Sequence, residues 1–408
     1  MPSNASSTRI VTVDALRGFA LLGILLAHMI YWYTAGPLPG SLYGKYQDIG
    51  SNIINILNEV LISGKFFAFF SFLFGLSFYL QLQSMEKRQD NFVARYAWRI
   101  AILGIIGVCH HAFWQGDILS IYAPLGFLLL PLRKLNNKWI LILGILFAVN
   151  LPGLIIQVID LLQHPPVPPP TNAPPPFDPE AEGRLYYWIV KIAGLSELWR
   201  YNLARLSTKF RFQLESGRIF ITFGFFLLGM YTGRRRWFET PEETKAVWKK
   251  ICRRSGWLAL GTLIIAVLIF VANEVFKLGW QQSRTVGIVF SVIQNTNSAA
   301  LVCFYISGLT LLMYRIRWQK LLYPLASVGK LALTCYLGQT FLGLLLFSGL
   351  GLGLIGQTAP WLNWLIGIGY FCLQVILSRL WLKSFYYGPL EWLWRSLTFF
   401  KWYQFRRK

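Results

Sequence analysis

Residues 13–28 read VDALRGFALLGILLAH, an apolar stretch interrupted by Asp14, Arg17 and His28. A run of this length and hydrophobicity predicts a membrane-spanning helix. Ten residues separate Arg17 from His28, so the two side chains share nearly one stripe of the helix and lie roughly 16 Å apart along its axis. Ionisable groups at membrane depth are costly, so each of the three is a candidate functional residue. The alternative for Asp14 and Arg17 is that they pair with each other among the lipid headgroups.

The composition of the whole chain excludes a soluble enzyme. Of 408 residues, 55% are hydrophobic, 16% aromatic and only 14% charged. The net charge of +22 does not predict nucleic-acid binding, because the basic clusters lie between apolar stretches and face anionic lipid. The five cysteines are scattered without metal-site spacing, so neither a disulfide scaffold nor a zinc site is predicted.

About ten transmembrane helices are expected, in an all-α polytopic membrane protein that forms one domain over residues 1–408. The first apolar stretch is expected to stay as a span and not to be cleaved as a signal peptide. The predicted spans cover residues 13–34, 64–83, 99–114, 117–132, 139–160, 217–233, 256–276, 286–313, 328–350 and 361–382.

The distribution of basic residues predicts the orientation. Most lie in five connections that fall on one side of the membrane if the spans alternate, namely 84–99, 133–138, 234–255, 314–327 and the basic tail 383–408. Positive charge marks the cytoplasmic side, so both termini, including the basic tail, are expected in the cytoplasm.

The insertion at 161–216 is expected on the outer side. Its proline-rich part, 164–179, predicts a stiff extended spacer. Its second part, 181–212, has the pattern of amphipathic helices with interspersed basic residues. Two interpretations stay open: helices that lie on the membrane surface, or a cap over an outward-facing site.

Three histidines and one carboxylate are expected at one level near the outer leaflet. His28 lies in the outer half of the first span, His110 and His111 end the third, and Asp117 begins the fourth. A histidine can act as a general base on a hydroxyl, and a carboxylate can fix its tautomer. A metal site is not predicted, because no His-x-x-x-His or His-Glu pairing occurs. The alternative is that His110 and His111 anchor a helix end at the interface.

Further polar residues fall inside predicted spans and could line a cavity or bind neighbouring helices. They are Gln294, Asn295 and Asn297 in the eighth span, and Tyr336 and Gln339 in the ninth.

Five segments in order resemble the YeiB family of bacterial inner-membrane proteins, the domain of unknown function 418. They are DALRGFALLGILL at 14–26, FFAFFSFLFGLSF at 66–78, GDILSIYA at 116–123, GKLALTCYLGQ at 329–339 and GPLEWLWR at 388–395. The resemblance covers essentially the whole chain and implies location in the bacterial cytoplasmic (inner) membrane. The family is grouped with transmembrane acyltransferases, and its members have also been described as transporters.

Proteins of acyltransferase family 3 carry an Arg and a His separated by ten residues in their first span, a spacing that Arg17 and His28 reproduce. Many YeiB-like proteins have Asn at the position of His28, so this chain departs toward the acyltransferase pattern. The resemblance implies that an acyl group passes from a cytoplasmic acyl-coenzyme A, such as acetyl-coenzyme A, to an extracytoplasmic or membrane acceptor.

In that interpretation Arg17 and Asp14 lie at the donor's phosphates, and His28 is the base that deprotonates the acceptor. Asp117 orients His110 or His111 as a helper, and the polar residues at 294–297, Tyr336 and Gln339 line the tunnel. The acceptor is a cell-envelope glycan, a lipid headgroup or a small hydroxyl or amine. The alternative function is a transporter of a small molecule or lipid through the same polar cavity. Membrane lipids are the expected partners, nucleic acid is not, and a homo-oligomer is left open.

Overall fold

The computed structural model describes residues 10–86, 91–163, 178–280 and 283–407. Residues 164–177 of the predicted proline-rich spacer, His164 among them, lie outside the described residues. So do residues 87–90 of the basic 84–99 connection. The described chain is all-α, with one isolated β-bridge between Phe385 and Arg406. The predicted all-α membrane fold is confirmed, since six of the described helices are long and apolar enough to cross a membrane.

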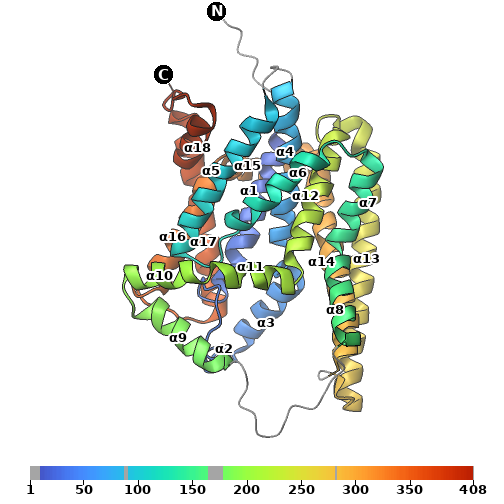
Figure 1. Ribbon diagram of the computed structural model, residues 1–408, viewed down its shortest axis with the longest axis vertical. Coiled ribbons are helices and arrows are strands. Elements are labelled where there is room, and N and C mark those ends of the chain that lie inside the picture. The colour runs from blue at the N-terminus through green and yellow to red at the C-terminus, as the bar shows by residue number, and fades with distance from the viewer. Residues whose placement is uncertain (1–9, 87–90, 164–177, 281–282, 408) are drawn as a thin grey trace, which may run out of the picture.

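The helices follow one another in a single bundle (Figure 1). Their bounds are α1 Val11–Met29, α2 Gly40–Tyr43, α3 Ile49–Leu57, the π-helix η1 Asn58–Ile62, α4 Phe66–Glu86, α5 Phe92–Phe113, α6 Leu119–Leu132, α7 Asn137–Ala148, α8 Leu151–Gln163, α9 Pro179–Lys191, α10 Leu195–Ala204, α11 Leu206–Glu215, α12 Arg218–Arg234, α13 Pro241–Phe276, α14 Arg284–Met313, α15 Ile316–Lys330, α16 Ala332–Phe347, α17 Pro360–Ser384 and α18 Pro389–Phe399.

Two predicted spans are broken. The chain bends by 51° between α7 and α8, where Asn150 takes the left-handed conformation with a φ of 60°. It bends by 82° between α15 and α16, inside the segment expected as one helix over 328–350. If each bent pair counts as one span, up to eight candidate spans lie in the described residues, so the number of about ten stays a prediction.

Glycines let the central helices approach closely. A Cβ at Gly75 of α4 would lie 1.9 Å from the carbonyl oxygen of Phe226, and one at Gly229 of α12 would lie 2.0 Å from that of Phe72. The two helices therefore pack backbone to backbone through reciprocal glycines. In the same way, a Cβ at Gly329 would lie 1.8 Å from the carbonyl oxygen of Asp14, so α15 packs directly on α1.

The break before α16 is held by α18. The carboxylate of Glu391 accepts hydrogen bonds from the backbone N–H groups of Leu333 (2.7 Å) and Thr334 (3.0 Å) and from the Thr334 hydroxyl (2.6 Å). These N–H groups are the ones that a helix start leaves without a partner. A second helix can therefore begin directly after the bend. Through Glu391, the segment 388–395 contacts the segment 329–339.

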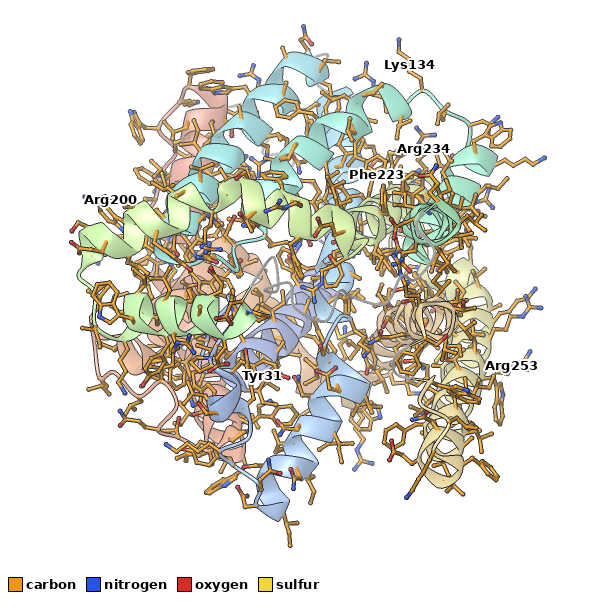
Figure 2. The ribbon with its side chains drawn as sticks, turned by 60° about the horizontal axis from the view of Figure 1, so that its bottom comes forward. Tyr31, Lys134, Arg200, Phe223, Arg234 and Arg253 are labelled. Atoms are coloured by element: carbon orange, nitrogen blue, oxygen red, sulfur yellow. The ribbon has the colours of Figure 1, made fainter. Side chains whose placement is uncertain are left out.

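The helices α9, α10 and α11, here called the cap, cross the bundle at the end opposite α18 (Figure 1). Pro179 follows the N-cap residue Asp178, whose side chain accepts from the N–H groups of Glu180 and Ala181. Apolar side chains of α13 and α14 are exposed along much of the outer edge, as expected for a lipid-facing surface. Arg253 of α13 lies at that edge (Figure 2).

Candidate functional site

A tight turn joins α5 to α6 and forms the centre of the site. Asp117 in this turn caps α6, because its carboxylate accepts from the N–H groups of Leu119 (3.1 Å) and Ser120 (2.8 Å). Gly107 allows the close approach, since a Cβ there would lie 2.5 Å from the Ser120 nitrogen. The last turn of α5 therefore meets the first turn of α6 around a buried carboxylate.

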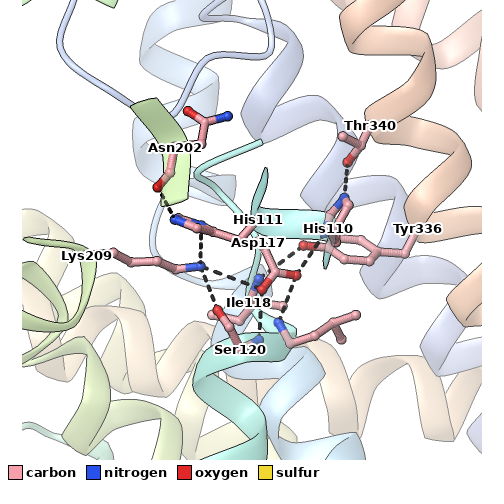
Figure 3. Close-up of polar contacts among 10 residues, drawn as sticks. His110, His111, Asp117, Ile118, Ser120, Asn202, Lys209, Tyr336 and Thr340 are labelled. Carbon is pink, nitrogen blue, oxygen red and sulfur yellow. Dashed lines mark hydrogen bonds and ion pairs between the residues drawn. The ribbon is translucent and has the colours of Figure 1, made fainter. Parts of the chain in front are cut away.

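His110 is held from both sides. Its Nδ1 lies 2.8 Å from Oδ1 of Asp117, and its Nε2 lies 2.9 Å from the hydroxyl oxygen of Thr340 on α16 (Figure 3). A carboxylate can only accept, so Nδ1 donates and a neutral ring accepts from the Thr340 hydroxyl at Nε2. The hydroxyl, the imidazole and the carboxylate thus form one chain, in the order that an activated nucleophile requires.

His111 takes part in a second set of polar contacts, which involves residues of the cap (Figure 3). Its Nε2 donates to the carbonyl of Asn202 at 2.9 Å, and its Nδ1 lies 3.3 Å from Nζ of Lys209. The Lys209 ammonium also donates to the Ser120 hydroxyl at 2.8 Å and lies 3.6 Å from Oδ2 of Asp117. The cap therefore supplies the cation that balances the buried carboxylate.

Lys209 carries a perturbed pKa. Burial lowers the pKa of its ammonium from 10.5 to about 8, and the nearby Asp117 carboxylate opposes that shift only in part. The side chain is only 9% exposed. A cation so well buried is costly without a partner, which makes the contact with Asp117 necessary for the cap to close.

A cavity of about 260 Å³, here called the basic cavity, lies between α1, α4, α5, α6, α15, α16 and α18. Its charged lining residues are Arg17, Arg99, Lys330 and the carboxylate Glu391, and its walls are mainly leucine, isoleucine and aromatic side chains. Tyr336 also lines it. The Tyr336 ring centroid lies 5.1 Å from that of His110, so this side of the cavity borders the His110 site.

The cations of the basic cavity differ in their contacts. Arg17 bonds Asp14 at 2.8 Å and the Ser77 hydroxyl at 2.6 Å. The guanidinium of Arg99 stacks over Trp394 at 3.7 Å. The Nε atom of Arg99 is buried and finds no hydrogen-bond partner among the described residues. The guanidinium of Arg99 as a whole lines the cavity and adds positive charge to its wall.

Two further hollows adjoin the site. A small pocket under the cap, here called the cap pocket, is lined by Tyr33, Trp114, Asn202 and Gly343 among others. An open apolar groove of about 560 Å³ runs between α5, α6 and α11 and is lined in part by Ser120. His110 itself lines none of these hollows, but its neighbours do: Tyr336 lines the basic cavity, and Trp114 lines the cap pocket. Ser120, which lines the apolar groove, is bonded to Lys209.

The remaining predicted site residues lie apart from His110. His28 is half-buried, with its ring centroid 4.6 Å from that of Trp114, and it is not among the residues that line the basic cavity. The ring centroid of Trp114 in turn lies 5.9 Å from that of His110, so Trp114 is a neighbour of both histidines. Gln339 donates to the carbonyl of Leu21 and to Gln374 inside the helix bundle.

The polar residues of α14 do not join the cavity either. Asn297 donates to the carbonyl of Ala259 and to the Thr262 hydroxyl on α13, as an interhelical hydrogen bond. Gln294 is exposed and Asn295 is half-buried on the same helix. The basic cavity is lined by none of the three.

Sequence reasoning gave no role to three residues that the structure brings to the site: Thr340, Lys209 and Arg99. Thr340 was visible as a polar residue in a predicted span, and Lys209 as one of several basic residues in the insertion. No spacing rule connects Thr340 with His110, 230 positions away, or Lys209 with His111, 98 positions away. Only the packing of α16 and of the cap shows the connection.

Comparisons with known proteins agree with this architecture. Residues 232–401 match the family model described as "Protein of unknown function (DUF418)". The uncharacterized protein YxaH of Bacillus subtilis (strain 168) is 27% identical over 431 residues, with 99% of this chain and 97% of YxaH covered. The uncharacterized protein YeiB of Escherichia coli (strain K12) is 26% identical over 418 residues, with 96% of each chain covered. An uncharacterized 39.9 kDa protein from Bacillus acidopullulyticus is 26% identical over 400 residues, covering 97% of this chain and 95% of that protein.

Proposed function

We propose that this chain, of which residues 232–401 match the DUF418 family model, is a membrane-embedded acyltransferase. In this proposal it lies in the bacterial cytoplasmic membrane and moves an acyl group from a cytoplasmic acyl-coenzyme A to an extracytoplasmic or membrane acceptor. The observation that carries the proposal is the basic cavity with its apolar walls, which borders a His–Asp pair.

The proposed binding of the acyl donor is supported by the chemistry of the basic cavity. An acyl-coenzyme A combines phosphates, a long neutral arm and a thioester. Arg17, Arg99 and Lys330 offer positive charge to the phosphates, and the apolar walls accommodate the arm. In the predicted topology, the ends of α1 and α5 that carry Arg17 and Arg99 face the cytoplasm, where coenzyme A is available.

The chemical step rests on His110. Asp117 fixes the proton on Nδ1, so Nε2, which accepts from the Thr340 hydroxyl in this structure, is the nitrogen that can take the proton of an attacking hydroxyl. The new carbon–oxygen bond forms as that proton moves to His110, and the carbon–sulfur bond then breaks to release coenzyme A, whose sulfur takes a proton. Asp117 stabilises the imidazolium that forms in between, as in other His–carboxylate pairs.

The acceptor side is formed by the cap pocket and the apolar groove. A small hydroxyl or amine, or the end of a glycan, would enter below the cap near Asn202. A lipid acceptor would approach along the apolar groove, which reaches Ser120 from the membrane. His28 lies behind Trp114 in this arrangement and shapes the pocket, so the proposal assigns the base to His110 and not to His28.

Transport is the second candidate, and one observation favours it. His110, Asp117 and Lys209 form a buried ionisable cluster between two hollows, which is also how a proton-coupled carrier would be built. In that case the substrate crosses the site without a change in covalent bonds.

The test uses purified protein in proteoliposomes with radiolabelled acetyl-coenzyme A and bacterial envelope lipids and glycans as acceptors. We expect saturable binding, and label in the acceptor fraction that His110→Ala abolishes and His28→Ala leaves within about tenfold. Label transfer that survives His110→Ala contradicts the assigned base. Absence of donor binding in the wild type, together with uptake of an envelope metabolite, favours the transporter.

A further inference from the structure

The Thr340 hydroxyl is bonded in an unusual way for a hydroxyl inside a helix. Several buried hydroxyls among the described residues donate to the carbonyl four residues earlier, as Thr310 does to Ile306 and Ser307 does to Cys303. Thr340 instead reaches across to α5 and lies 2.9 Å from Nε2 of His110 (Figure 3). It is only 2% exposed, and Asp117 fixes the other ring nitrogen at 2.8 Å.

The candidate base, His110, therefore already contacts a hydroxyl group of the protein, that of Thr340. An imidazole has two nitrogen atoms, and the one that can take a proton here already contacts a hydroxyl of the protein itself. A base so occupied is poised to deprotonate that hydroxyl first. An acceptor from outside would have to displace Thr340 from His110 before it could be activated in one step.

Thr340 also lies between the two hollows. On α16, side chains four and seven residues apart share one face. Tyr336 lines the basic cavity, Thr340 contacts His110, and Gly343 lines the cap pocket. The hydroxyl thus occupies the turn of α16 that separates the donor side from the acceptor side.

We infer that Thr340 carries the acyl group between the two sides, so that transfer takes place in two steps through an ester on its hydroxyl. This inference rests on the proposed function. In the first step, the Thr340 oxygen attacks the thioester carbonyl and its proton passes to His110. The carbon–sulfur bond breaks and the coenzyme A sulfur takes that proton from the imidazolium, which restores neutral His110.

In the second step, an acceptor hydroxyl or amine attacks the Thr340 ester from the cap pocket. His110 takes the acceptor's proton and returns it to the Thr340 oxygen as the ester bond breaks, so no other reactant is needed. Tyr336 is placed to assist the first step. Its phenol accepts from the N–H of Ile118 and keeps a proton to donate to the developing oxyanion.

The experiment traps the ester. Full-length protein in detergent is incubated with radiolabelled acetyl-coenzyme A without acceptor and quenched in acid. Peptides are then analysed by tandem mass spectrometry. The variants are Thr340→Val, which keeps the shape but lacks the hydroxyl, Thr340→Ser, which keeps the hydroxyl, and Thr310→Val as a matched buried control. Gel-filtration profiles and donor affinity establish that each variant is folded.

We expect wild type, Thr340→Ser and Thr310→Val to carry an acetyl group on residue 340. Thr340→Val should carry none and lose turnover by at least about 100-fold. If Thr340→Val turns over at the wild-type rate while His110→Ala is inactive, the acceptor attacks the donor directly. That result overturns transfer through a Thr340 ester and leaves the proposed function standing. If the wild type neither binds nor consumes the donor, both the Thr340 ester and the proposed function are wrong.

Discussion

The Nδ1 atom of His110 and the Oδ1 atom of Asp117 lie 2.8 Å apart, and the two residues belong to neighbouring helices joined by a short turn. The carboxylate accepts from two backbone N–H groups and pairs with Lys209, so it is stabilised as an anion even when His110 is neutral. A fixed anion behind a histidine orients the ring and favours the imidazolium that forms when the ring takes a proton.

Asp117→Asn should test this pair directly. The amide keeps the size of the side chain but removes the charge and the preference for a proton on Nδ1. We expect turnover to fall by about 10²- to 10⁴-fold, with donor affinity within about twofold of the wild type. Single-turnover acyl transfer and equilibrium binding of acetyl-coenzyme A measure the two quantities. Asp160→Asn on α8 is the matched control, and an equal loss in both variants would contradict a special role for Asp117.

Arg99→Gln should weaken donor binding and leave chemistry intact. Arg99 lines the basic cavity, so its guanidinium would attract an anionic ligand bound there. We expect the Kd for coenzyme A to rise about 10- to 100-fold, and the salt dependence of binding to decrease. Arg253→Gln removes an equal charge from the exposed edge of α13 and should have no effect. Equal losses in the two variants would mean that only net charge matters.

Much of the fold could be predicted because membrane spans can be recognised by their length and hydrophobicity. The all-α membrane class and the YeiB-like, DUF418 resemblance are confirmed, and α1, α5, α13, α14 and α17 lie where apolar runs predict helices. The bend between α15 and α16 could not be predicted, because the break depends on Glu391, some 60 residues later, which caps the new helix. Hydropathy alone carries no information about such a contact.

The site was predictable only where its residues are close in sequence. His110, His111 and Asp117 lie within eight positions and could be grouped by inspection. The role predicted for His28 stays a prediction; its ring lies against Trp114, which is also a neighbour of His110. Thr340 and Lys209 come from α16 and the cap, and their approach depends on tertiary packing that periodicity does not encode.

Gly75→Ala should destabilise the protein although it adds a single methyl group. The new Cβ would lie 1.9 Å from the carbonyl oxygen of Phe226, so α4 and α12 would have to separate. We expect a loss of about 1–3 kcal/mol in unfolding free energy, seen as a lower thermal midpoint in detergent. Gly261→Ala on α13, where nothing lies within 4 Å of the added Cβ, is the control and should be neutral or slightly stabilising. Equal midpoints for the two variants would contradict the close packing.

The pKa of Lys209 makes the stability of the capped protein depend on pH. Burial lowers this pKa from 10.5 to about 8 in the folded protein. Below about pH 8 the side chain is protonated in both the folded and the unfolded chain, so its contribution does not change. Between about 8 and 10.5 the unfolded chain binds more protons than the folded chain, so raising the pH stabilises the folded state.

Lys209→Met cannot titrate and therefore lacks this gain. As the pH rises from about 8 toward 10.5, the thermal midpoint of the wild type should increase relative to that of Lys209→Met, by an amount that corresponds to at most about 3 kcal/mol. Other titrating groups are common to both proteins and cancel in the difference. A constant difference for Lys209→Met would mean that Lys209 is solvated in the folded protein, and that the cap does not close over Asp117 as the structure has it.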